Sequence, residues 1–144
     1  MENIEKYRVI NLEEKEEIDR LASNALKTLA TDENEETSNI LKKIDEFILA
    51  FDNEDPEDWE KYGYELGSLF GNLISKEYSW KWYWVEADEE TYYCITSPNE
   101  KACCVCHNYF YSILTKAHSN NFRLLFNMIE KTSYPDNWKF EVLN

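Results

Sequence analysis

The chain has 144 residues, of which 43% are hydrophobic and 15% aromatic, and its formal net charge at pH 7 is −14. This composition predicts one folded domain with a sizeable core, spanning residues 1–144, and argues against intrinsic disorder. The negative charge argues against nucleic acid and anionic membranes as partners, and it favours either a basic partner or simply a solvated surface.

Charged and aromatic residues are unevenly distributed along the chain. Residues 1–60 contain 19 acidic and 7 basic residues, whereas residues 61–144 contain 10 acidic and 8 basic ones and 18 of the 22 aromatic residues. We therefore expect an acidic helical layer over about 1–60 and an aromatic-rich α+β core over about 61–144. The opening residues lack the apolar stretch of a signal peptide, so we expect a cytoplasmic protein whose four cysteines are thiols.

Three helices are predicted in the N-terminal part. Asn11 is placed to cap the first, over residues 12–30, because a glutamate follows three residues further on. The second, over residues 38–51, has apolar residues at helical spacing, namely Ile40, Leu41, Ile44, Phe47, Ile48 and Phe51. The third begins near Pro56, which suits a first helical turn, and continues to about Tyr78.

Three strands are predicted next, over residues 80–87, 91–97 and 102–106, with turn signals between them. Two helices are expected to follow, over residues 107–117 and 122–131. The expected architecture is therefore α+β: N-terminal helices, a small antiparallel three-stranded sheet, and two C-terminal helices that cover the sheet.

Trp80, Trp82 and Trp84 alternate along the first predicted strand, which puts their side chains on one face. The only glycines are spaced by four along one side of the third predicted helix: Gly63, Gly67 and Gly71. Because large indoles need small counterparts in a close-packed core, we interpret the tryptophans as packed over this glycine strip. The alternatives are an exposed aromatic patch that binds a ligand or a protein, and a glycine strip that forms a homodimer surface.

The sequence CCVCH groups three cysteines with His107, and Cys94 lies on the preceding strand. A zinc site needs four converging ligands, whereas Cys103 and Cys106 form the only C-x-x-C pair. Either cysteine with His107 would be a nucleophile and a base, but neighbours in sequence rarely have the geometry of a catalytic dyad. We therefore expect no cofactor, no metal and no catalytic residue, and we place the cysteines in the core.

The stretch YGYELGSLFGNLISKEYSWKWYWV, followed by a Tyr-rich strand, SPNEK, HNYFYSIL and FRLLFNMIEK, resembles small acidic bacterial immunity proteins of toxin–immunity pairs. Some of these belong to contact-dependent growth inhibition and other polymorphic toxin systems. Such proteins have a helix with L-G-x-L-F-G, a Trp-bearing strand, short strands and closing helices. They bind a toxin domain and protect the cell that produces it. The resemblance covers roughly residues 60–132 and implies no catalytic residue.

The leading hypothesis is thus a non-enzymatic immunity protein that binds and neutralises a basic toxin, expected to be a nuclease. A nuclease holds phosphates in a cationic cleft, which a carboxylate-rich surface can cover. The first candidate partner-binding segment consists of Asp52, Glu54, Asp55, Glu57 and Asp58, with Trp59 and Tyr62 as aromatic anchors. The second consists of Glu86, Asp88, Glu89 and Glu90 at the turn of the predicted hairpin.

Two alternatives stay open on the sequence alone. A small acidic secretion chaperone would hold extended segments of an effector protein and would dimerise without a partner. A thiol or metal enzyme would be centred on Cys94, Cys103, Cys106 and His107. It would show bound zinc, or a thiol pKa well below the usual value of about 8.5.

Overall fold

The structure, a computed structural model, describes residues 1–144. The fold is α+β, as the sequence predicts, with five helices and one five-stranded mixed sheet. In chain order the elements are β1 (Ile4–Val9), α1 (Leu12–Thr28), α2 (Thr37–Ala50), α3 (Pro56–Tyr78), β2 (Lys81–Ala87), β3 (Glu90–Thr96), β4 (Ala102–Cys104), α4 (Cys106–Leu114), α5 (Phe122–Ile129) and β5 (Glu141–Val142). None of the helices combines the length and the apolar composition that a membrane span requires.

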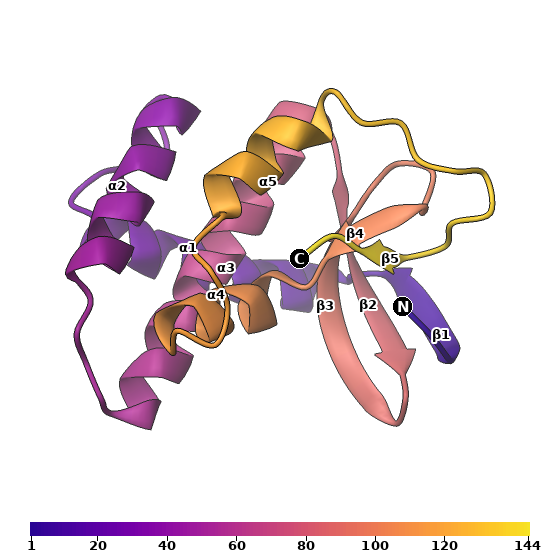
Figure 1. Ribbon diagram of the computed structural model, residues 1–144, viewed down its shortest axis with the longest axis horizontal. Helices are drawn as coiled ribbons and strands as arrows, with labels where there is room; N and C mark the ends of the chain where they lie inside the picture. The colour runs from indigo at the N-terminus through magenta and orange to yellow at the C-terminus, as the bar shows by residue number, and fades with distance from the viewer.

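The sheet has the strand order β1-β2-β3-β4-β5, with antiparallel pairing throughout except between β4 and β5, which are parallel. The predicted three-stranded sheet is therefore wrong, because both outer strands, β1 and β5, were missed. β1 lies within residues 1–60, so the acidic part of the chain is not entirely helical. Figure 1 shows the helices on one side of the molecule and the sheet on the other, with β1 at the sheet's outer edge.

Local sequence signals account for the helix positions. Asn11 accepts a hydrogen bond from the Glu14 backbone N–H, and the Glu14 carboxylate accepts one from the Asn11 N–H, which completes a capping box at the start of α1. Asp55 caps α3 by accepting from the Glu57 N–H, and Pro56 occupies the first turn. The predicted end of α1 is two residues too late, the predicted bounds of α2 are within one residue of the structure, and those of α3 are confirmed.

α3 is the central helix, and it packs against α1 on one side and α4 on the other. The two later helices were expected to cover the sheet and to end the chain. Instead α4 packs mainly on α3, and β5 follows α5. The reason for this packing is the backbone of α3, which has no side chains at Gly63 and Gly67 and so admits α4 at close range.

The glycine strip faces two different surfaces. A Cβ atom added to Gly71 would lie 2.1 Å from Cζ2 of Trp82, so this glycine is covered by a tryptophan as predicted. The prediction is wrong for the other two, since a Cβ at Gly67 would lie 2.6 Å from the Cys106 carbonyl oxygen and one at Gly63 would lie 2.9 Å from Cα of Tyr111. The strip is therefore mainly a helix–helix contact.

The three tryptophans of the predicted aromatic face are buried to different degrees. Trp80 and Trp82 are 5% and 2% exposed and belong to the large core between the sheet and the helices. Trp84 is half-buried, and the guanidinium carbon of Arg8 lies 4.9 Å above its ring centroid. The core interpretation is thus confirmed for Trp80 and Trp82 and only partly for Trp84.

A second, smaller core covers the opposite face of the sheet. It consists of Val85, Ala87, Cys94, Cys103, Val105 and Phe140. Phe140 belongs to the segment after α5, which Figure 1 shows looping past the end of the sheet before it returns beside β4 as β5. Both faces of β2 and β3 are therefore buried, by helices on one side and by this C-terminal segment on the other.

Positive φ angles occur only at residues other than glycine, among them Asp88 at 52° and Glu89 at 64°. These two residues form the turn between β2 and β3, since Ala87 pairs directly with Glu90. A two-residue hairpin turn with both φ angles positive is a type I′ turn, which usually contains Asn-Gly or Asp-Gly. The chain instead places two carboxylates there.

Candidate partner-binding surface

The first predicted acidic segment connects α2 to α3. Its carboxylates on Asp52, Glu54 and Glu57 are exposed and project from the connection and the first turn of α3. Asp55 is also exposed but caps α3, and half-buried Asp58 accepts a hydrogen bond from Nδ2 of Asn53 at 3.0 Å. The structure thus divides the five predicted carboxylates into three that are exposed without a hydrogen-bonding role and two that accept a hydrogen bond, Asp55 from a backbone N–H and Asp58 from the Asn53 side chain.

Neither predicted aromatic anchor is fully available to a partner. Nε1 of Trp59 donates to the Asn53 carbonyl oxygen at 2.8 Å, so the half-buried indole fixes the connection before α3. The ring of Tyr62 is half-buried, with its centroid 5.3 Å from that of Phe47 and 5.9 Å from that of Phe51. Both residues therefore stabilise the junction of α2 and α3, and Trp59 retains some exposed surface beside the acidic residues.

An apolar feature beside this segment was missed by the sequence analysis. Leu49 is 75% exposed near the end of α2, and it borders a cavity of about 530 Å³ between α2 and α4, whose lining includes Phe51 and Ile113. Leu49 is an apolar residue outside the apolar stripe of α2. Its position in the sequence alone could therefore have identified it as an exposed leucine. We define the acidic-apolar surface as Asp52, Glu54, Glu57 and Leu49 together with this cavity.

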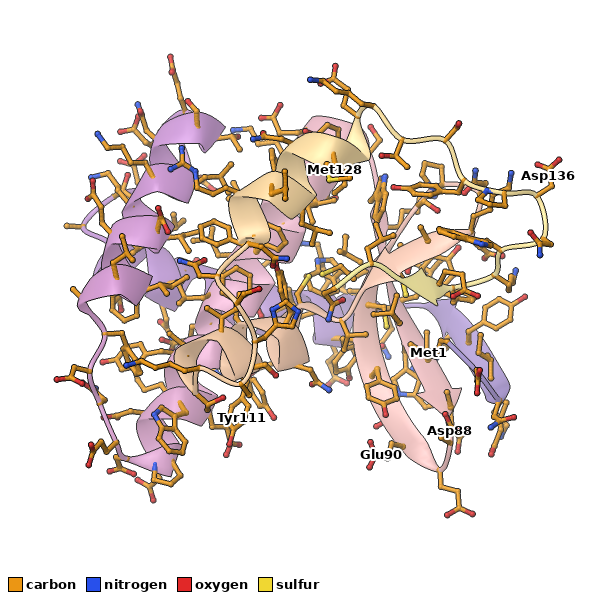
Figure 2. All side chains as sticks on the ribbon, in the orientation of Figure 1. Met1, Asp88, Glu90, Tyr111, Met128 and Asp136 are labelled. Carbon is orange, nitrogen blue, oxygen red and sulfur yellow. The ribbon has the colours of Figure 1, made fainter.

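The second predicted segment lies at the hairpin turn. Glu86 is half-buried opposite Lys6 in the strand register, and exposed Asp88 accepts from Nδ2 of Asn3 at 2.6 Å. Exposed Glu90 accepts from the Tyr92 hydroxyl at 2.7 Å, and Glu89 is exposed as well. Figure 2 shows Asp88 and Glu90 at the tip of the hairpin. Figure 1 shows that this tip and the start of α3 are well separated, so the two segments do not form one continuous patch.

All four cysteines are free and buried. Cys94 and Cys103 share the smaller core, whereas Cys104 and Cys106 lie in the larger one, and Cys104 lies opposite Ile95 rather than Cys94 in the strand register. A hydrogen bond with Cys103 and burial raise the pKa of the Cys94 thiol, and burial raises that of Cys104. These shifts oppose thiolate chemistry, and no group of three metal-binding side chains is brought together.

His107 is paired with a serine that the sequence analysis did not connect to it. Nε2 of His107 lies 2.8 Å from the Ser68 hydroxyl oxygen, across the contact between α3 and α4. The imidazole stacks on Trp82 with ring centroids 5.9 Å apart, and burial lowers its pKa to about 4. Because Ser68 is fully buried, this pair resembles an internal hydrogen bond that joins two helices rather than an accessible nucleophile with its base.

Comparison of the chain with protein-family models, with curated proteins and with solved structures gives no match.

Proposed function

We propose that the protein is an immunity protein: it binds a basic toxin domain, expected to be a nuclease, and neutralises it stoichiometrically without catalysing a reaction. The observation that carries this proposal is the acidic-apolar surface, where the three exposed carboxylates of the connection between α2 and α3 follow shortly after exposed Leu49, which borders the cavity. Interfaces of proteins that bind tightly commonly combine an apolar anchor with charges at its rim.

Charge complementarity gives this surface a defined physical role. The chain carries a net charge of −14, and a basic toxin domain would be attracted over roughly the Debye length of about 8–10 Å at moderate salt. Carboxylates at the rim of an interface mainly raise the association rate constant, whereas a buried apolar contact mainly lowers the dissociation rate constant. We therefore assign capture to Asp52, Glu54 and Glu57, and residence time to Leu49.

The first test is capture followed by inhibition. Tagged protein is incubated at low salt with a lysate of its native host, the column is washed with rising salt, and the retained chains are identified. The expected result is a basic protein, held at a one-to-one ratio, whose toxic activity falls to the baseline when this chain is added in equal amount. An effector that is retained unfolded and keeps its activity afterwards would instead identify a secretion chaperone.

Matched charge variants then locate the surface. The triple variant Asp52→Asn, Glu54→Gln, Glu57→Gln removes three charges without removing a helix cap, and the control Glu16→Gln, Glu33→Gln, Glu130→Gln removes three exposed charges elsewhere. At low salt we expect the first variant to reduce the association rate constant by about tenfold, and the control by less than threefold. Equal reductions would show that only net charge matters and that this surface is not the contact.

A further inference from the structure

β1 presents the longer free edge of the sheet. β1 has six residues and pairs with β2 on one side only, whereas the other outer strand, β5, has two residues. The N–H of Ile10 donates to the carbonyl oxygen of Trp82 at 3.2 Å, and Val9 lies opposite Tyr83. Because hydrogen-bonded and non-hydrogen-bonded pairs alternate in an antiparallel ladder, the backbone N–H and C=O groups of Val9 point away from β2. The same alternation turns the backbone groups of Tyr7 outward.

The second half of β1 lacks the features that usually block strand addition. The register shifts between Ile4 and Lys6, so a bulge or irregularity interrupts the first half. No such shift occurs from Lys6 to Val9, and the outward carbonyl of Val9 has only a 3.4 Å contact with the Arg8 guanidinium. The side chains of Tyr7 and Val9 are 44% and 49% exposed. An extended chain could therefore hydrogen-bond along this half.

A cavity lies where β1 ends. Its volume is about 380 Å³, and its lining includes Val9, Trp80 and Leu12, the last of which is 75% exposed. Lys15 and Lys81 also line it, which makes it unfavourable for a cationic side chain. The cavity thus suits an apolar side chain of a strand that pairs with Val9.

The charges around the edge of β1 determine which side chains are favoured on an added strand. Exposed Glu5 and Asp88 lie at its beginning, where Asn3 joins Asp88 by a hydrogen bond, and exposed Glu13 follows its end. The basic residues of β1 are matched by carboxylates, since Arg8 forms an ion pair with Glu14 at 2.6 Å and Lys6 lies opposite Glu86. The edge is therefore acidic at its beginning, whereas at its end Glu13 lies near Lys15 and Lys81 of the cavity.

We propose that an extended segment of the basic partner adds to β1 as a sixth strand. Its backbone bonds to Tyr7 and Val9, an apolar side chain enters the cavity beside Leu12, and basic side chains face Glu5 and Asp88. The inference rests on the proposed function for the identity of this partner. A second copy of the chain is a poorer occupant, because both copies would carry a charge of −14.

The first test uses a defined probe, an end-capped octapeptide of alternating valine and lysine. In an NMR titration we expect the amide hydrogens of Tyr7 and Val9 to become protected from solvent exchange. The same peptide with N-methyl groups on alternate residues keeps its charge but loses the donors on one edge, and its Kd should be at least tenfold higher. Equal binding of the two peptides, or chemical-shift changes confined to other elements, would overturn the inference.

The variant Val9→Pro tests the same contact from the protein side. It removes an N–H that points outward, and it leaves the Ile10 donor to β2 in place. We expect the Kd of the valine–lysine peptide to rise at least tenfold in Val9→Pro and less than threefold in the control Val9→Thr, which keeps the N–H. If Val9→Pro does not fold, the N-methylated peptide still decides the question on the unaltered protein.

The outcomes separate this inference from the proposed function. If the protein neutralises a basic toxin and Val9→Pro does so with an unchanged Kd, strand addition is wrong while the immunity function stands. If no basic toxin is bound but the unmethylated peptide pairs with β1, the immunity function is wrong and the edge is still a strand-binding site. A dimer in sedimentation that Val9→Pro dissociates would identify a second copy as the occupant, against the inference.

Discussion

The two faces of the sheet are buried by different kinds of structure. On one face, Trp82, Ile95 and Cys104 belong to a core of 25 residues that the helices complete. On the other face, Val85 and Cys103 belong to a core of six residues, with Phe140 contributed by a segment that has little regular structure. The first core is held by several helices at once, whereas the second is covered by the returning segment together with the N-terminal residues Met1 and Ile4.

This difference shows how stability is distributed in the molecule. The returning segment is fixed by backbone hydrogen bonds to β4 and to the turn before it, from Phe140 to Glu100, from Glu141 to Lys101 and from Leu143 to Cys103. Elements with few buried apolar contacts open more readily than those at the centre of a core. We therefore expect the helix-covered face to set the global free energy of unfolding and the other face to open locally.

The largest expected effect on stability comes from adding a side chain where α3 and α4 are in close contact. In Gly67→Leu, the Cβ atom alone would lie 2.6 Å from the Cys106 carbonyl oxygen and 2.9 Å from the His107 backbone nitrogen. Because these are backbone atoms, the helices must separate, and the free energy of unfolding should fall by more than about 4 kcal/mol. Urea denaturation measures this. Glu60→Leu on the exposed side of α3 is the control, and similar losses in both variants would contradict the packing described.

A smaller effect is expected from the opposite face. Phe140→Ala empties the centre of the six-residue core and should cost about 3 kcal/mol. Hydrogen exchange of the Glu141 and Leu143 amides should become much faster. The exchange rates of amides in the middle of α3 should change only as far as the global free energy of unfolding changes. If α3 and β5 amides respond equally, the two faces form one cooperative unit and the comparison fails.

The smallest effect is a pH dependence that belongs to the helix-covered face. The pKa of His107 is about 4 in the folded protein, lowered by burial, against an ordinary value of about 6.5. The unfolded chain therefore binds a proton below pH 6.5 that the folded chain does not, and stability falls by up to about 1.4 kcal/mol per pH unit between pH 6.5 and 4. Denaturation of the protein and of His107→Gln at pH 7 and pH 5 measures it, and an identical pH slope would exclude His107 as the cause.

The sequence allowed the helices to be predicted closely because their signals are local. Asn11 with Glu14 and Asp55 with Pro56 fix the starts of α1 and α3 through hydrogen bonds within a few residues. β1 was missed because the alternation of Lys6 and Arg8 with Tyr7 and Val9 is only four residues long and is broken by the register shift after Ile4. The carboxylates that balance Lys6 and Arg8 come from β2 and α1. The strand is defined only once those distant elements are in place.

The same distinction between local and distant contacts applies to the candidate partner-binding surface. The exposure of Asp52, Glu54 and Glu57 follows from a hydrophilic connection between two helices, and the sequence was enough to predict it. The use of Tyr62 in packing was not predictable, because it depends on how α2 meets α3. Leu49 could have been found, since an apolar residue outside a helical stripe is conspicuous in the sequence alone.

The left-handed turn at Asp88 and Glu89 has a consequence for protein engineering. All three glycines lie in α3, so this turn holds two residues that strain their backbones by about 1–2 kcal/mol each. Glycine at either position should raise the melting temperature, and a screen for thermostability would select it readily. Each such substitution also deletes a carboxylate beside the free edge of β1. A version of this protein optimised for heat resistance alone would therefore lose negative charge from the hairpin tip, which lies next to the edge where we propose that the partner adds.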